Sequence, residues 1–465
     1  MEKRKRREID LTQGRISTQM IHFFIPIFCG IFFQQIYITA DAIIIGKVIS
    51  SDALAAVGCT GAFLNLLIGF FMGIGSGATV VIAQYFGAHE YDQVRKATHT
   101  ALVLAASLGL AFTVIGFLIS PWLLTILKTP AAVFDMSVQY LQVYFFGMLP
   151  SMLYNMGSGI LRAVGDAKRP VYILITTAII NIILDLLFTA GLQMGVRGAA
   201  LATVLSQFLA MFLVLLCMYR EKDLPVQLHF RELKPDGRLL LRIIRIGLPT
   251  GLQSTMFDLS NLLIQASVNL LGPNTMAAWT AYTNISLIFW MTISAMGTTV
   301  TTFAGQNFGA AKLDRLHQGI KTGMLLATGV CFIISVFSVV FRYPLSRLFL
   351  DDPEIVATCM HMLLFLSPTY ILYMFIEIYS GMIRGVGEAL IPMIITGLSI
   401  CVFRVFWVLV VLPFNGSLDM ICLSYPISWA LGSFAFFLYY KKGTWLTKRL
   451  SPAQREELAA SKNTR

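Results

Sequence analysis

Apolar residues run along this chain in stretches of about twenty or more, separated by short polar segments. Such stretches are expected to be helices, because an open sheet edge cannot face lipid. The alternating pattern of a membrane β-barrel, with about ten residues per strand, is absent. We therefore predict an all-α integral membrane protein with twelve transmembrane helices, near residues 20–48, 53–85, 97–119, 133–160, 170–190, 198–219, 246–271, 275–304, 318–341, 355–383, 392–413 and 418–440.

The composition supports this fold class and argues against several functions. Hydrophobic residues make up 57% of the chain, the mean hydropathy is +0.74, and charged residues are only 13%, compared with roughly 25% in a soluble domain. The seven cysteines are dispersed and form no C-x-x-C pair, so we expect neither a metal site nor a disulfide framework. No His-Glu-x-x-His motif, paired catalytic aspartate motif or Ser/His dyad is present. We therefore expect neither an enzyme nor a cofactor.

The basic residues predict the orientation of the helices. The formal net charge is +11, and most Lys and Arg residues fall in alternate loops and in the two ends of the chain. Because basic residues favour the cytoplasmic side, both termini are expected in the cytoplasm of a cell in whose inner membrane the protein lies. The basic run Lys3–Arg7 directly precedes a span, so we do not expect it to bind nucleic acid. The opposite loops carry few basic residues, namely Lys47, Lys128, Arg197, Arg342 and Arg347.

The chain repeats itself at an offset of 222 residues. The block 158–170 matches 380–392 with seven of thirteen residues identical, and residues near 84–92 match those near 306–314 in the same register. Each repeat holds six spans, so both halves have one orientation and are expected to be related by a pseudo-two-fold axis along the membrane normal. We predict an N-lobe over 1–225, a cytoplasmic linker over 226–245, a C-lobe over 246–441 and a cytoplasmic tail over 442–465.

Two carboxylates lie within the apolar stretches of the first half. Asp41 and Asp185 each follow a proline, Pro26 or Pro170, by fifteen residues. If both spans begin at the same membrane face, a rise of about 1.5 Å per residue places both acids roughly 22 Å along. An Asp at a helix centre costs on the order of 2.5–3.5 kcal/mol on insertion scales, so each acid needs a partner or a function. The matched depth predicts a cation site.

Other oxygen-bearing side chains fall near the same depth. Tyr37 lies four residues before Asp41, and Asn181 four before Asp185, so each pair shares a helix face. Thr203 is expected about 12 Å below the outer end of its span. Such oxygens suit a hard cation, and Na⁺ is one candidate for Asp41, Asn181, Asp185 and Thr203. A buried carboxylate that exchanges protons fits equally well, and interhelical hydrogen bonding is a purely structural alternative.

The remaining intramembrane polar residues form no comparable pattern. Asp258, Glu377 and Arg404 lie within spans of the second half, and Asn155 occupies the repeat position of Glu377. Because intramembrane charges often pair, Glu377 and Arg404 are candidates for a structural ion pair. A substrate-binding role is an equal alternative for these four secondary candidates.

The chain resembles multidrug and toxic compound extrusion (MATE) transporters over essentially its twelve spans. The repeated Ser-Gly-x-x-Arg-x-Val-Gly-[Asp/Glu] blocks, together with Pro26 and Asp41, carry the resemblance, which is strongest to the DinF-like branch. It implies export of organic cations or amphiphilic drugs, and hence drug resistance, by antiport with H⁺ or Na⁺. It also implies a cation site at Asp41, Asn181, Asp185 and Thr203 with Tyr37 beside it, and a gating bend at Pro26. We expect a monomer whose partners are the drug and membrane lipid.

Two other transport functions are alternatives. A flippase for lipid-linked cell-envelope precursors would have a related fold, but it would need a strongly cationic cavity for a diphosphate, and Arg404 is the lone arginine deep in a span. A passive channel would need a filter loop, and nothing in the sequence resembles one.

Overall fold

A computed structural model describes residues 9–221, 225–442 and 444–447. Within this part of the chain every regular element is a helix, and the predicted all-α fold is confirmed. The chain divides into two compact units. The first unit contains residues 25–251 with the segment up to Asp10, and the second contains Leu11–Phe24 and everything from Leu252 onward.

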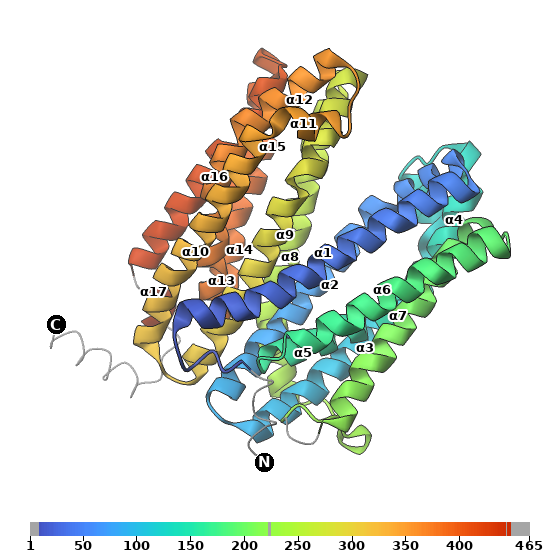
Figure 1. Cartoon of the computed structure of the whole chain (residues 1–465). Helices are drawn as coiled ribbons and strands as arrows, with labels where there is room; N and C mark the ends of the chain where they lie inside the picture. Colours follow the sequence, from blue (N-terminus) through green and yellow to red (C-terminus); the bar gives the residue numbers. More distant parts are fainter. Residues whose placement is uncertain (1–8, 222–224, 443, 448–465) are drawn as a thin grey trace. The chain divides into compact units, whose positions relative to one another are not determined.

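The first unit carries the helices of the first repeat (Figure 1). Helices α1, α6 and α7 surround the candidate site described below, and α2, α4 and α5 complete the bundle around it. The bounds are α1 Ile16–Ile44 with a π-helical turn η2 Ile45–Ile49, α2 Ser51–Gly87, α3 Tyr91–Ile126, α4 Ala131–Phe146, α5 Met148–Ala163, α6 Lys168–Leu186 with a π-helical turn η3 Leu187–Gly191, and α7 Gly195–Arg220.

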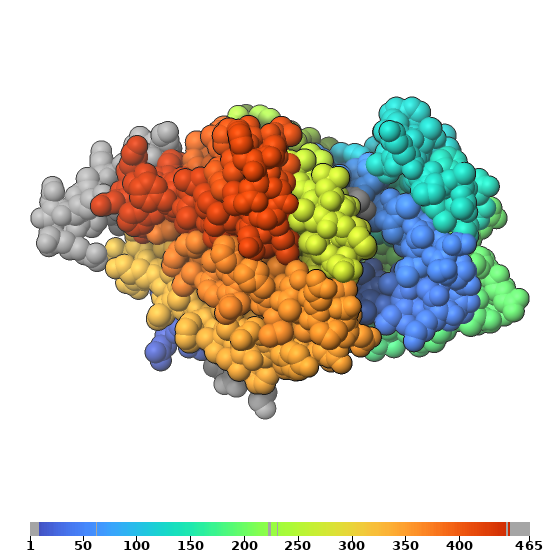
Figure 2. All heavy atoms as spheres, turned by 90° about the horizontal axis from the view of Figure 1, so that it is seen from above, coloured from blue at the N-terminus to red at the C-terminus, as the bar shows by residue number. Residues whose placement is uncertain are grey.

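The second unit is built around α13, which packs against α9, α10 and α16. Helix α12 packs against both α10 and α16, and the surface of this part of the chain is coloured from yellow-orange to red in Figure 2. The bounds are η4 Phe230–Glu232 before this unit, α8 Gly237–Asn269, α9 Pro273–Gly309, α10 Leu313–Val340, α11 Arg342–Arg347, α12 Pro353–Leu366, η5 Ser367–Thr369, α13 Tyr370–Gly385, α14 Leu390–Thr396, η6 Gly397–Val402, α15 Phe403–Phe406, η7 Trp407–Val411, η8 Leu412–Phe414, α16 Leu418–Lys441 and α17 Thr444–Thr447.

Each of the twelve predicted spans corresponds to a helical segment of the described residues, and most helices extend several residues beyond the prediction. Ten of these segments are long and apolar enough to cross a membrane. The fourth span falls short because it breaks at Gly147 into α4 and α5, each of 16 residues. Helix α8 falls short because its apolar part, after Arg245, is interrupted by polar residues such as Gln253, Asp258 and Asn261.

The boundary between the units differs from the one we predicted. Helix α8 begins at Gly237, so the second part of the predicted linker 226–245 is helical. The start of α1 belongs to the second unit and the start of α8, up to Gly251, to the first. Of the predicted tail 442–465, residues 448–465 lie outside the described residues, as does the basic run Lys3–Arg7.

Polar contacts explain why the start of α1 belongs to the second unit. The backbone N–H of Leu11 donates to Oε1 of Gln306 at 3.2 Å, and Nδ2 of Asn307 donates to the Leu11 carbonyl at 3.1 Å. The guanidinium of Arg315 donates to the carbonyls of Gln13 and Gly14, at 2.8 Å each. Gln306 belongs to the repeated block near 306–314, so this block holds the chain just before α1.

The internal repeat extends to the backbone conformation. Gly165 and Gly387, which are equivalent in the repeat, have positive φ angles of 91° and 97°. His89 and Ala311, also 222 residues apart, have φ angles of 59° and 56°. A positive φ is rare for residues with a side chain, so two equivalent turns of this kind indicate that the repeat is structural as well as sequential.

Helices α2 and α8 approach each other at glycines. A Cβ atom on Gly77 would lie 2.6 Å from the backbone nitrogen of Gly247, and one on Gly247 would lie 2.7 Å from the carbonyl oxygen of Ile74. A Cβ atom on Gly75 would meet nothing within 4 Å. The spacing Gly73-x-x-x-Gly77 therefore permits backbone contact of the kind found at small-residue helix interfaces.

The contrast between these glycines gives a testable prediction. Gly77→Ala should destabilise the protein by about 1–3 kcal/mol, because the new methyl group overpacks a backbone contact. Gly75→Ala is the matched control, since it brings the same gain in helix propensity without a clash. Thermal unfolding in detergent should show a lower midpoint for Gly77→Ala alone. Equal midpoints for the two variants would contradict the close contact.

Candidate cation-binding site in the first unit

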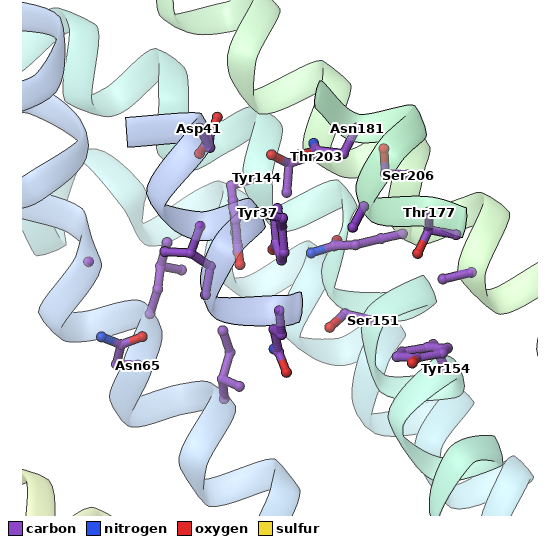
Figure 3. A pocket seen from close by; sticks show the side chains of 18 of the residues that line it. Tyr37, Asp41, Asn65, Tyr144, Ser151, Tyr154, Thr177, Asn181, Thr203 and Ser206 are labelled. Carbon is purple, nitrogen blue, oxygen red and sulfur yellow. The ribbon is translucent and has the colours of Figure 1, made fainter. Parts of the chain in front are cut away.

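The first unit encloses a cavity of about 360 Å³. Helices α1, α6 and α7 contribute polar side chains to it, and Figure 3 shows Asp41, Thr203 and Asn181 in its upper part with Tyr37 and Tyr144 below them. Among the residues that the structure describes, no Lys or Arg lines the cavity, and Asp41 is its one charged lining residue. The polar lining residues are Gln34, Tyr37, Asp41, Thr60, Asn65, Tyr140, Tyr144, Ser151, Tyr154, Asn155, Thr177, Asn181, Thr203, Ser206 and Gln207.

The structure brings Asp41 and Asp185 together. Asp41 comes from α1 and Asp185 from α6, and their carboxyl groups lie in contact with each other. The Asp185 side chain is fully buried. Neither of its oxygens, nor Oδ1 of Asp41, has a hydrogen-bond donor among the described residues. Two adjacent carboxylates without donors repel each other when both are ionised, so the pair requires a proton or a cation between them.

Asn181 and Thr203 are buried beside the pair, with exposed fractions of 1% and 5%. Asn181 lies one helical turn before Asp185 on α6, as the four-residue spacing predicted. Neither its amide nitrogen nor its amide oxygen has a partner among the described residues. A buried amide is ordinarily hydrogen-bonded. Its free oxygen is therefore available to a cation.

Tyr37 lies on the same face of α1 as Asp41 and interacts electrostatically with both acids. Tyr140 and Tyr144 come from α4, and their rings lie 5.9 Å apart. Together these rings give the cavity an apolar surface with hydroxyl groups at its edge. Aromatic rings of this kind attract organic cations as well as hydrocarbon.

The sequence did not reveal that both acids are followed by π-helical turns. The turn η2 begins four residues after Asp41, and η3 begins two residues after Asp185. The two turns pack against each other. Such turns are rare and frequently occur at functional sites. Apolar periodicity carries no signal for them, because the hydrophobic pattern of five residues does not distinguish a π-helical turn from an α-helical one.

Ser206 and Gln207 were also missed, although their positions offered a signal. They lie three and four residues after Thr203 on α7, so all three share a face. Oγ of Ser206 is buried without a partner among the described residues, and the Gln207 side chain interacts with the Tyr144 hydroxyl. Gln207 reaches the break at Gly147, where a Cβ atom would collide with its amide oxygen. The glycine therefore makes room for a polar side chain of the cavity.

The secondary candidates are placed differently. Asn155 lines the same cavity and donates to the carbonyl of Ser151 at 2.9 Å. The predicted pairing of Glu377 with Arg404 is wrong, because Glu377 pairs with Arg384 at 3.3 Å, two turns further along α13. Asp258 lies on α8 and forms no ion pair within the described residues.

The donor set favours a small, hard cation. It combines two carboxylates with amide and hydroxyl oxygens, the ligands that Na⁺ and similar ions prefer. Within the described residues no group of three or more His, Cys, Asp or Glu side chains is arranged to hold a metal ion. One added proton or monovalent ion would leave the carboxyl pair with a single negative charge.

Comparisons with known proteins agree with this architecture. The sequence profile of the MatE family matches residues 26–187 and 249–410. A probable multidrug resistance protein, YoeA of Bacillus subtilis, is 30% identical over 442 residues, which is 92% of this chain and 94% of the relative. The probable multidrug resistance protein NorM of Thermotoga maritima is 25% identical and covers 84% of each chain.

The fold is also that of solved transporters. A structure described as the outward-facing conformation of a multidrug resistance MATE family transporter has a TM-score of 0.88 and 24% identity, and the match covers 95% of this chain and 99% of that one. The two MatE matches begin at equivalent points of the internal repeat, near Pro26 and Pro249. The chain therefore belongs to the MatE family of multi-pass membrane transporters, with its twelve-helix, two-lobe fold.

Proposed function

We propose that this protein is a secondary active multidrug efflux transporter that exports organic cations or amphiphilic compounds in exchange for H⁺ or Na⁺. The observation that carries the proposal is the contact between the carboxyl groups of Asp41 and Asp185, where Oδ1 of Asp41 and both oxygens of Asp185 have no donor among the described residues. The pair would bind the coupling ion, with Asn181, Thr203 and Tyr37 as further oxygen ligands. The relatives described as multidrug resistance proteins support drugs as the cargo.

The coupling mechanism follows from repulsion within the pair. Neutralisation of the pair by an ion from outside would allow α1 and α6 to approach, whereas loss of the ion would drive the two acids apart. An ion drives transport only if it binds two conformations with different affinity. We propose Pro26 as the hinge of this change, because a proline within a helix removes a backbone hydrogen bond and favours a bend there.

The cavity lining supports a cationic or amphiphilic cargo. Tyrosine rings and neutral amides surround a single charged lining residue, Asp41. A flippase for lipid-linked precursors would need basic groups to hold a diphosphate, and no Lys or Arg of the described part of the chain lines this cavity. We therefore favour drug efflux over precursor translocation.

Loss of either acid should abolish ion-driven efflux. Asp41→Asn and Asp185→Asn keep the side-chain shape but remove the charge that binds the ion, so we expect at least a tenfold loss of transport. The measurement is efflux of a fluorescent organic cation from proteoliposomes, with a Na⁺ gradient or a pH gradient imposed separately. The response to each gradient would identify the coupling ion.

Asp135→Asn is the matched control, because Asp135 is an exposed acid at the start of α4. It should transport at the wild-type rate. Wild-type efflux by both site variants under both gradients would refute the proposed coupling site.

The same pair makes a prediction about stability. Asp185→Asn should raise the free energy of unfolding by roughly 1–2 kcal/mol in a Na⁺-free buffer of neutral pH, since it removes one of two unpaired buried acids. Thermal unfolding of the purified protein measures this change, again with Asp135→Asn as the control. A lower midpoint for Asp185→Asn would mean that the carboxylate is held by stabilising partners.

A further inference from the structure

A second unexplained charge lies in the other unit. Arg404 is fully buried on α15, in the fifth span of the second repeat. At the repeat offset of 222 residues it corresponds to Ile182, which directly follows Asn181 of the cation site. Asp185 corresponds to Trp407 at the same offset, so the two units place charges of opposite sign three residues apart in the repeat, within one helical turn.

The partners of Arg404 are all uncharged. Nε donates to Oγ of Ser428 at 3.4 Å, and Nη1 donates to Oδ1 of Asn261 at 3.2 Å. The ring of Tyr425 lies 4.0 Å from the guanidinium carbon. Arg404 forms no ion pair with an acid among the described residues. Glu377, the acid predicted to pair with it, is paired with Arg384 instead.

Two buried donors in this region have no acceptor. Nη2 of Arg404 and Nε1 of Trp429 both lack a partner among the described residues, and both side chains have an exposed fraction of 0%. They belong to one cluster, because the ring of Trp429 lies 5.5 Å from that of Tyr425, which covers the guanidinium. Buried N–H groups are rarely left without an acceptor.

The backbone around Arg404 is also unusual. The short helix α15 is flanked by the π-helical turns η6 and η7. Turns of this type frequently mark functional sites because they displace side chains from the regular helix surface. The distortion is thus an observation independent of the free donors.

We propose that Arg404, Asn261, Tyr425, Ser428 and Trp429, here named the Arg404 cluster, form a binding site for a small monovalent anion such as chloride. The free groups are donors, and an anion offers only acceptors. The positive charge of the Arg404 guanidinium would be balanced by the single negative charge of the anion. The side chains are tightly buried, which favours a compact ion over a substrate with an organic tail.

The proposed anion site does not depend on the proposed efflux function. Chloride binding can therefore be measured directly on the purified protein. Replacing gluconate by chloride at constant ionic strength should raise the thermal unfolding midpoint in a saturable manner, because an ion that binds only the folded state stabilises it. Iodide, a contact quencher of indole, should quench part of the tryptophan fluorescence with the same saturation.

Two variants make the test specific. Trp429→Phe keeps an aromatic ring but removes the indole N–H, so the half-saturating chloride concentration should rise on the order of tenfold, and the saturable quenching should disappear. Trp407→Phe is its control, because Nε1 of Trp407 already donates to the Met420 carbonyl at 2.8 Å. Its chloride affinity should equal that of the wild type.

Arg404→Gln should abolish the chloride effect, whereas Arg347→Gln, at an exposed arginine, should retain it. If Arg404→Gln fails to fold, the wild-type titration and Trp429→Phe still decide the matter. Equal stability of the wild-type protein in chloride and gluconate would overturn the proposal and assign Arg404 to packing against Tyr425 alone. An unchanged chloride affinity in Trp429→Phe would show that the indole N–H of Trp429 does not bind the anion.

Discussion

The repulsion between two carboxyl groups is the constraint on which the first unit depends. Asp41 and Asp185 are placed in contact by two different helices, and no donor among the described residues reaches Oδ1 of Asp41 or either carboxylate oxygen of Asp185. Inside a medium of low polarity such repulsion is large, because little water is present to screen it. In the proposed mechanism, the energy of the bundle therefore changes when an ion arrives at the pair or leaves it. That dependence is what a coupled transporter requires.

The surrounding structure is consistent with movement near this pair. Each acid is followed by a π-helical turn, the fourth span is broken at Gly147, and α1 contains Pro26 close to the point where the chain passes from one unit to the other. Irregular backbone within membrane spans is common where transporters bind their substrates and ions. Helices that pack closely at glycines, such as α2 and α8, form the more rigid part of the first unit.

Apolar run lengths and the internal repeat predicted most of the fold. The spans were recovered because the bilayer imposes one length and one composition on every crossing helix. The site residues Asp41, Asn181 and Asp185 were found because charged and amide side chains are costly in such spans. Thr203 and Tyr37 followed from helical spacing, and the structure brings all five together in one unit. Their role in ion binding remains a proposal.

Other features could not be predicted, for physical reasons. The predicted helices were too short because the search for apolar stretches leaves out polar first turns. The first turns of α8, with Arg238 and Arg242, are an example. The pairing of Glu377 with Arg384 instead of Arg404 depends on which helix faces meet, which composition does not specify. Ser206 and Gln207 are ordinary interhelical polar residues until the cavity beside them is known.

Infrared difference spectroscopy of the purified protein tests the central claim most directly. Addition of alkali or of Na⁺ should remove the C=O band of one protonated, buried carboxyl group, and the change should be lost in Asp185→Asn and altered in Asp41→Asn. A wild-type spectrum without such a band, or the same band in both variants, would show that the two acids do not share an ion.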